Sequence, residues 1–132
     1  MTSVERKSEN DNGFLLMTAM TQAFLKNSPE RAKRANISPE ALAKAKLISP
    51  REETEEAGIG NEITVRFEGE EEDETYVLLG PLDHLVNPRW ISADSAMGRI
   101  FIGRRKGEIV FYKDTQGKTR RVEIIAIRPG RF

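Results

Sequence analysis

The residue types that most often carry out catalysis are scarce in this chain. Its 132 residues include one histidine, His84, and no cysteine. A Ser-His-Asp or Cys-His arrangement would have to be built on His84, whose neighbours in residues 81–85 are typical of an ordinary loop. The composition excludes zinc sites made of several histidines or of cysteines. We therefore expect no catalytic residue, no metal site and no cofactor, and we expect that the chain is not an enzyme.

Two further segments have some features of ligand-binding loops. Residues 68–74 are rich in carboxylates but lack the spacing of a calcium-binding loop, so we expect a solvated turn, with a weak cation site as the alternative. Gly117-Lys118-Thr119 matches the last three residues of a phosphate-binding loop. However, Tyr112 stands where the first glycine of such a loop belongs, and strand patterns flank the segment. We predict a hairpin turn there.

Basic side chains form two candidate contact surfaces. One is the loop 104–106, which lies between two glycines and could meet phosphates. It has no interleaved aromatic residues, so a solvated turn is favoured, and DNA or other nucleic-acid binding through the basic stretch 99–121 is the alternative. The second group lies in residues 31–34. The candidates are Arg31, Lys33, Arg34, Arg104, Arg105 and Lys106.

Charge is unevenly distributed along the chain although its formal total is zero. Residues 26–46 hold six basic and two acidic residues, and residues 51–74 hold eleven acidic and two basic ones. Residues 99–132 hold ten basic and three acidic residues. Either the acidic and basic faces pair across the fold, or one of them is left for a partner.

Length and composition predict one small domain with an appendage. The densest apolar run, residues 14–20, is far shorter than the ~20 residues that cross a bilayer, and no signal-peptide pattern precedes it. With no cysteine to form a disulfide, we expect a cytoplasmic location.

The first half of the chain is predicted to be helical. Residues 1–12 are polar and unpatterned, which indicates a flexible tail, and residues 13–50 are predicted to form a short helical hairpin. Apolar residues at helical spacing predict a helix over 14–26, capped by Asp11 or Asn12, and two Ser-Pro-Glu starts predict short helices over 29–35 and 39–46. The apolar stripe is Phe14, Met17, Met20, Ala23 and Phe24. It suits an internal core, with a partner groove or a homodimer seam through helix 14–26 as the alternative.

The second half has the period of strands. An acidic linker at 51–60 is predicted to separate the hairpin from a domain at 61–132. Alternation predicts strands at 61–67, 75–79, 90–91, 108–112 and 119–127. A short helix follows Asp94 and Ser95, which are both candidate caps, and Gly103 ends it. The expected fold class is α+β, with a mainly antiparallel sheet covered by one packed helix.

Residues 91–108 carry a family resemblance. The run Ile-Ser-Ala-Asp-Ser-Ala-Met-Gly-Arg-Ile-Phe-Ile-Gly-Arg-Arg-Lys-Gly-Glu resembles the C-terminal signature of the bacterial Gre transcript-cleavage and elongation factors. Segments 47–50, 60–65, 74–81 and 122–127 follow in the family's order, so the resemblance covers about residues 47–128.

The resemblance implies an FKBP-like domain that docks on the β′ subunit of RNA polymerase at the rim of the secondary channel. The docking element would be Asp94, Ser95, Ala96, Met97 and Gly98. Ala96 replaces the family's proline, which frees the backbone there, and Ile100 replaces a usually small residue. A peptidyl-prolyl isomerase, suggested by the implied fold alone, is a less favoured alternative.

The N-terminal half departs further from the family. Gre factors act through a long coiled coil whose acidic tip helps to hold a magnesium ion in the polymerase's active centre. The predicted first helix would reach only ~20 Å, and Glu30 stands alone among bases in residues 27–34. We therefore predict a Gre-like protein that binds polymerase and modulates transcription without stimulating transcript cleavage. Its layout resembles the nucleoside diphosphate kinase regulator branch, in which the finger is shortened.

Overall fold

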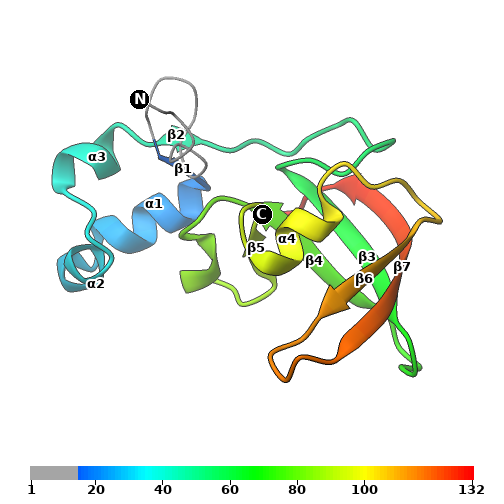
Figure 1. Ribbon diagram of the computed structural model, residues 1–132. Helices are drawn as coiled ribbons and strands as arrows, with labels where there is room; N and C mark the ends of the chain where they lie inside the picture. The colour runs from blue at the N-terminus through cyan, green and yellow to red at the C-terminus, as the bar shows by residue number, and fades with distance from the viewer. Residues whose placement is uncertain (1–14) are drawn as a thin grey trace, which may run out of the picture.

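The computed structural model describes residues 15–132, which form a helical region and a sheet region (Figure 1). The predicted flexible tail, residues 1–12, lies outside the described residues, as do Phe14 and the predicted caps Asp11 and Asn12. Within the described part of the chain, no helix combines the length and the hydropathy that crossing a membrane requires.

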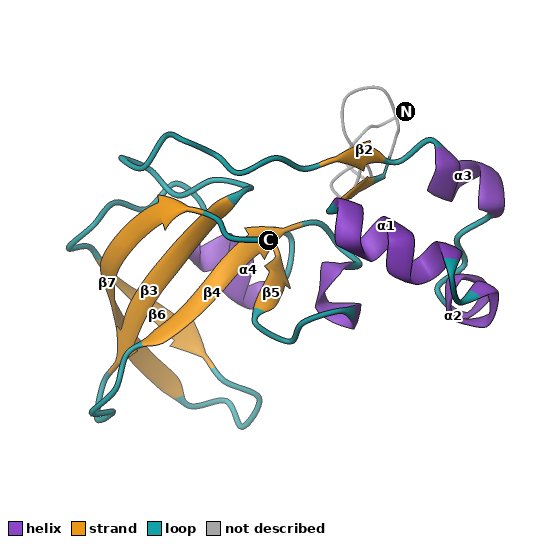
Figure 2. Ribbon diagram, turned by 180° about the vertical axis from the view of Figure 1, so that it is seen from behind, coloured by secondary structure: helices purple, strands orange, loops and turns teal. Residues whose placement is uncertain are grey.

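The helical region contains three short helices. They are α1 (Ala19–Lys26), α2 (Pro29–Arg34) and α3 (Pro39–Ala43). Before and after them, β1 (Leu16–Met17) and β2 (Lys46–Leu47) pair in parallel and bring the two ends of the region together (Figure 2). A small core forms inside from Met17, Leu25, Ala32 and Leu42.

The predicted start of the first helix is wrong. Helix α1 begins at Ala19, after the cap Thr18, whose backbone is extended and whose Oγ1 accepts the N–H of Thr21 at 3.0 Å. Met17 belongs to β1, and Met20 is 54% exposed, so the predicted apolar stripe does not form one helix face. The threonine cap and the strand pairing of residues 16–17 override the helical spacing that begins at Phe14. Strand pairing also ends α3 at Ala43, before the predicted residue 46.

The sheet region has five strands, β3 (Asn61–Phe67), β4 (Glu74–Leu79), β5 (Trp90–Ser92), β6 (Ile109–Lys113) and β7 (Thr119–Pro129). Their order is β5-β4-β3-β7-β6, and every neighbouring pair is antiparallel except β4 and β5. The hairpin between β6 and β7 is closed by Asp114, whose side chain accepts the N–H groups of Gln116 and Lys118. The predicted mainly antiparallel sheet and the turn at residues 117–119 are confirmed.

The sheet is covered on both faces, by different parts of the chain. Alternate residues of β3, Ile63, Val65 and Phe67, join the core beneath α4 (Ala96–Phe101), in which Phe101 is fully buried. On the other side, Val77, Leu79 and Trp90 pack with partly buried residues that include Ile48 and Phe132. The prediction of one packed helix on one face is confirmed, and the period-two alternation of β3 explains why it packs there.

Residues 51–60, predicted as an acidic linker and called here the acidic strap, pack along the sheet region. Ala57 is buried, its N–H donates to the Arg104 carbonyl at 2.9 Å, and its carbonyl accepts from Gly103 at 2.8 Å. The side chain of Asn61 donates to the carbonyl groups of Arg51 and Glu53 and accepts the N–H of Gly58, all three in the strap. The strap is therefore held by hydrogen bonds at both of its ends and in its middle.

Candidate functional site

The turn between β5 and α4 is locked by serine side chains. Ser95 caps α4: its Oγ accepts the N–H of Gly98 at 3.0 Å and donates to the Ser92 carbonyl at 2.6 Å. The Oγ of Ser92 accepts the N–H of Asp94 at 3.0 Å. Of the two predicted caps, Ser95 is the one that caps the helix.

A glycine lets the first turn of α4 press against this backbone. Gly98 is buried, and a Cβ built on it would lie 2.0 Å from the Ser92 carbonyl oxygen. Side chains larger than hydrogen therefore force the helix away from the turn. Together with Phe101, which anchors the other end of the helix in the core, Gly98 fixes how the turn is presented.

The predicted docking residues divide into two groups. Ser95 and Gly98 are engaged within the turn, so their role is to shape it. Ala96 is exposed, and Asp94 and Met97 are half-buried. Across residues 15–132, no hydrogen bond or ion pair is recorded for the Asp94 carboxylate, which leaves its oxygens available to an external donor.

A cleft lies beside Asp94 that the sequence did not predict. It lies between α4 and the acidic strap and has a volume of about 580 Å³. The strap contributes Arg51 and Ile59, and α4 with its end contributes Arg99 and Ile102. Both isoleucines are 38% exposed. Because its walls come from segments some 40 residues apart, only the fold brings them together.

Arg51 is unusual among the residues of this cleft. Its Nε is buried without an acceptor in the part of the chain that the structure describes, and it lies over Gly58, where a Cβ would be 2.5 Å away. A buried donor without a partner costs about 1–3 kcal/mol. The cleft is therefore lined both by a cationic group with unused hydrogen-bonding capacity and by Asp94, whose carboxylate has no recorded partner among the described residues.

The basic loop after α4 is largely neutralised by nearby acids. Arg105 pairs with Glu56 at 3.0 Å and with Glu55 at 3.4 Å, both in the acidic strap. Arg104 lies 3.8 Å from Glu108 and donates from Nε to a helix carbonyl. Of the two alternatives that the charge distribution left open, this loop follows the one in which acidic and basic residues pair across the fold. Lys106 is exposed beside them.

The other basic candidates lie at the opposite end of the molecule. Arg31, Lys33 and Arg34 are exposed on α2, and the guanidinium of Arg31 stands 5.0 Å from the ring centre of Phe24. Figures 1 and 2 place α2 and the loop that follows α4 far apart, so the two basic groups do not form one surface.

The acidic turn at residues 68–74 is solvated, as predicted, and its carboxylates pair with neighbouring arginines. Asp73 lies 2.7 Å from Arg66, and Glu74 pairs with Arg89. That hydrogen bond with Glu74 raises the pKa of Arg89, whose guanidinium also covers the ring of Tyr76. Burial raises the pKa of Tyr76 above its ordinary value. Among the residues described, no cluster of three or more His, Cys, Asp or Glu side chains could hold a metal ion.

The comparisons with known proteins place the chain in a family. Residues 52–129 match the model of the family described as "Transcription elongation factor, GreA/GreB, C-term". The chain belongs to the GreA/GreB family. The match begins inside the acidic strap and includes all five strands of the sheet region and α4.

The chain is also similar to individual proteins, one by sequence and others by structure. It is 31% identical over 88 residues to the transcription elongation factor GreA of Roseiflexus castenholzii, covering 66% of this chain and 55% of that protein. The chain thus matches about half the length of that relative. A GreA/GreB factor from Nitrosomonas europaea superposes with a TM-score of 0.50 at 18% identity, over 86% of this chain and 98% of the other, which supports the fold. The structure of Gfh1 from Thermus thermophilus gives a TM-score of 0.48 at 20% identity, over 83% and 81%.

Proposed function

We propose that this Gre-family chain binds RNA polymerase through the turn at the start of α4 and modulates transcription from there. The observation that carries the proposal is the Asp94 carboxylate, which has no recorded partner in residues 15–132 and stands on a turn locked by Ser95 and Gly98. A preformed turn loses little entropy on binding, and a free carboxylate can accept from a cationic side chain. The partner that the family resemblance implies is the β′ subunit of RNA polymerase, at the rim of the secondary channel.

We further propose that the chain does not stimulate transcript cleavage. Among the described residues before the sheet region, from position 15 onward, the longest helix is α1, which has eight residues and spans about 12 Å at 1.5 Å per residue. The first turn of α2 carries Glu30, but the last turn of the same helix carries Arg31, Lys33 and Arg34. Short reach and a basic surface both oppose delivery of carboxylates to a magnesium ion inside the polymerase.

The docking experiment measures binding of the purified full chain to core RNA polymerase. We expect Asp94→Ala to weaken binding at least about tenfold, the effect of losing about 1.4 kcal/mol from a charge-assisted contact. Asp73→Ala is the matched control, because Asp73 is an acid of the sheet region in a different turn, paired with Arg66. Wild-type protein that fails to bind, or two variants with equal affinity, would sink the docking proposal.

The cleavage experiment uses stalled, backtracked elongation complexes and follows the length of the RNA. We expect no acceleration of RNA shortening by the full chain at concentrations that saturate the docking assay, while a cleavage-competent GreA accelerates it. Shortening that the chain stimulates would overturn the second proposal and leave the first intact.

The remaining alternatives stay predictions. They are the FKBP-like character of the sheet region, peptidyl-prolyl isomerase activity, nucleic-acid binding through residues 99–121, and a homodimer through helix 14–26. The ion pairs of Arg104 and Arg105 weigh against the nucleic-acid alternative, because these charges are already partly satisfied.

A further inference from the structure

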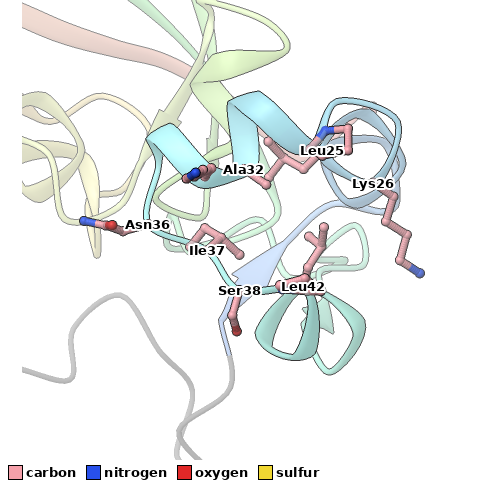
Figure 3. Close-up of a pocket in the computed structure, with 10 residues that line it drawn as sticks. Leu25, Lys26, Ala32, Asn36, Ile37, Ser38 and Leu42 are labelled. Atoms are coloured by element: carbon pink, nitrogen blue, oxygen red, sulfur yellow. The ribbon is translucent and has the colours of Figure 1, made fainter.

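A groove in the helical region shares no lining residue with the cleft beside α4. It lies between the end of α1, the helix α2 and the start of α3, and it has a volume of about 710 Å³ (Figure 3). Its apolar wall is made by Leu25, Pro29, Ala32, Ile37, Pro39 and Leu42. Clefts of this size with a mostly apolar lining and a few polar groups are typical of binding sites.

The charged side chains that line the groove are both cationic. Lys26 comes from the end of α1 and Lys33 from α2, and both are exposed. No ion pair within residues 15–132 is recorded for either lysine. The acids of this region, Glu30 and Glu40, are not among the residues that line the groove. The groove therefore has an exposed basic edge, and the buried side chains of Leu25, Ala32 and Leu42 form its apolar floor.

We propose that this groove binds an acidic, amphipathic peptide segment of a partner protein. One or two large apolar side chains of the segment would occupy the space between Ala32, Ile37 and Leu42, and its carboxylates would meet Lys26 and Lys33. Charge complementarity selects the occupant: a basic peptide would set like charges against the two lysines. Three short helices around an apolar groove are also the arrangement that receives the apolar face of an amphipathic peptide.

The position of the groove makes it independent of the α4 turn. In both views, α2 and α3 lie at the end of the molecule remote from the sheet (Figures 1 and 2). A chain held on a large assembly through α4 would keep the groove accessible. The groove would then be a second contact, which binds a different segment from the one that α4 meets.

The test titrates the isotope-labelled full chain with synthetic peptides and follows backbone NMR signals. The acidic probe is a twelve-residue peptide with two leucines four positions apart and glutamates at the remaining exposed positions. One comparison peptide has the leucines replaced by serine, and another has the glutamates replaced by lysine. We expect the acidic probe to shift the signals of Ala32, Ile37 and Leu42, and both comparison peptides to bind at least about tenfold more weakly.

Two double variants with the same change of net charge test the site. Lys26→Glu with Lys33→Glu reverses the edge of the groove and should weaken binding of the acidic probe about tenfold or more. Lys44→Glu with Lys46→Glu changes exposed lysines of the same region that do not line the groove, and should change affinity less than threefold. All four lysines are exposed, so both variants are expected to fold.

Three outcomes would overturn the proposal: no shifts at the groove with the acidic probe at 1 mM, equal binding of the lysine peptide, or equal weakening by both double variants. The measurement contains no polymerase, so its failure leaves the docking proposal untouched. Likewise, a failure of the chain to bind polymerase would not contradict the proposal that the groove binds an acidic peptide.

Discussion

The carboxylate of Asp83 accepts the backbone N–H of Thr18 at 2.9 Å across 65 positions of sequence. The same oxygen accepts the hydroxyl of Thr18 at 3.0 Å and that of Thr21. The other oxygen accepts the N–H of Gly80 at 2.8 Å. Asp83 is fully buried, so this one side chain joins the first turn of α1 to the loop that follows β4.

Replacing Asp83 should destabilise the whole fold. Asp83→Ala leaves the buried donors of Thr18, Thr21 and Gly80 without acceptors, and we expect a loss of about 3 kcal/mol in the free energy of unfolding, measured by urea denaturation. Asp73→Ala, which removes an exposed ion pair, should cost less than about 1 kcal/mol. Equal losses in the two variants would show that the buried hydrogen bonds of Asp83 stabilise the fold no more than one exposed ion pair does.

Replacing Asn61 by aspartate, the residue closest to it in shape, should strongly destabilise the fold. Its Nδ2 lies 3.1, 2.9 and 3.0 Å from the carbonyl oxygens of Arg51, Glu53 and Arg128, and its Oδ1 accepts from Gly58 at 2.9 Å. Asn61→Asp replaces the donor by a charged acceptor facing three carbonyls, so we expect a loss of about 3–5 kcal/mol.

Hydrogen exchange localises that effect. In Asn61→Asp the amide of Ala57, which anchors the acidic strap, should exchange much faster than in the wild type. Asn36→Asp makes the same chemical change at an exposed position just after α2, and it should cost no more than about 1 kcal/mol. A strap that stays protected in Asn61→Asp would contradict the role given to Asn61.

A proline at position 96, which the family resemblance implies, should stabilise the α4 turn. Ala96 is the first residue of α4, and Ser95 before it is extended, at φ −70° and ψ 165°, which a following proline requires. Ala96→Pro should raise the free energy of unfolding by about 0.4–1 kcal/mol. Arg99→Pro, which removes the N–H that donates to the Ser95 carbonyl, should lower it by about 3 kcal/mol. Thermal unfolding distinguishes the two, and a destabilised Ala96→Pro would refute this account of the turn.

The stability of the protein should fall in alkali partly through Tyr76. Burial raises its pKa in the folded state, so above about pH 10 the unfolded chain loses this proton first and the free energy of unfolding decreases. The contribution is fully present below the unfolded pKa and is lost as pH rises through the folded one. Tyr76→Phe should show a smaller decrease between pH 9 and 11 in urea denaturation. Identical pH profiles would exclude this contribution.

Local patterns were sufficient for the sheet region. The alternation of Ile63, Val65 and Phe67 predicts the buried face of β3, because successive side chains of a strand point to opposite sides. The short helix α4 and its cap, Ser95, also follow from adjacent residues. The first helix was misplaced at its start because the pairing of β1 with β2, some 30 residues later, decides that Met17 is extended.

The sequence alone determined which residues form the turn before α4 that we propose as the docking element, since residues 91–108 carry both the cap chemistry and the family resemblance. Only the tertiary structure decided what these residues can do. It showed that Ser95 is engaged in hydrogen bonds within the turn and Gly98 in close packing against it, that Asp94 borders a cleft shared with Arg51, and that two acids of the strap pair with Arg105. The physical reason is distance: hydrogen bonds and ion pairs between residues 50 or more positions apart depend on how the strands and strap are brought together, and no local pattern records them.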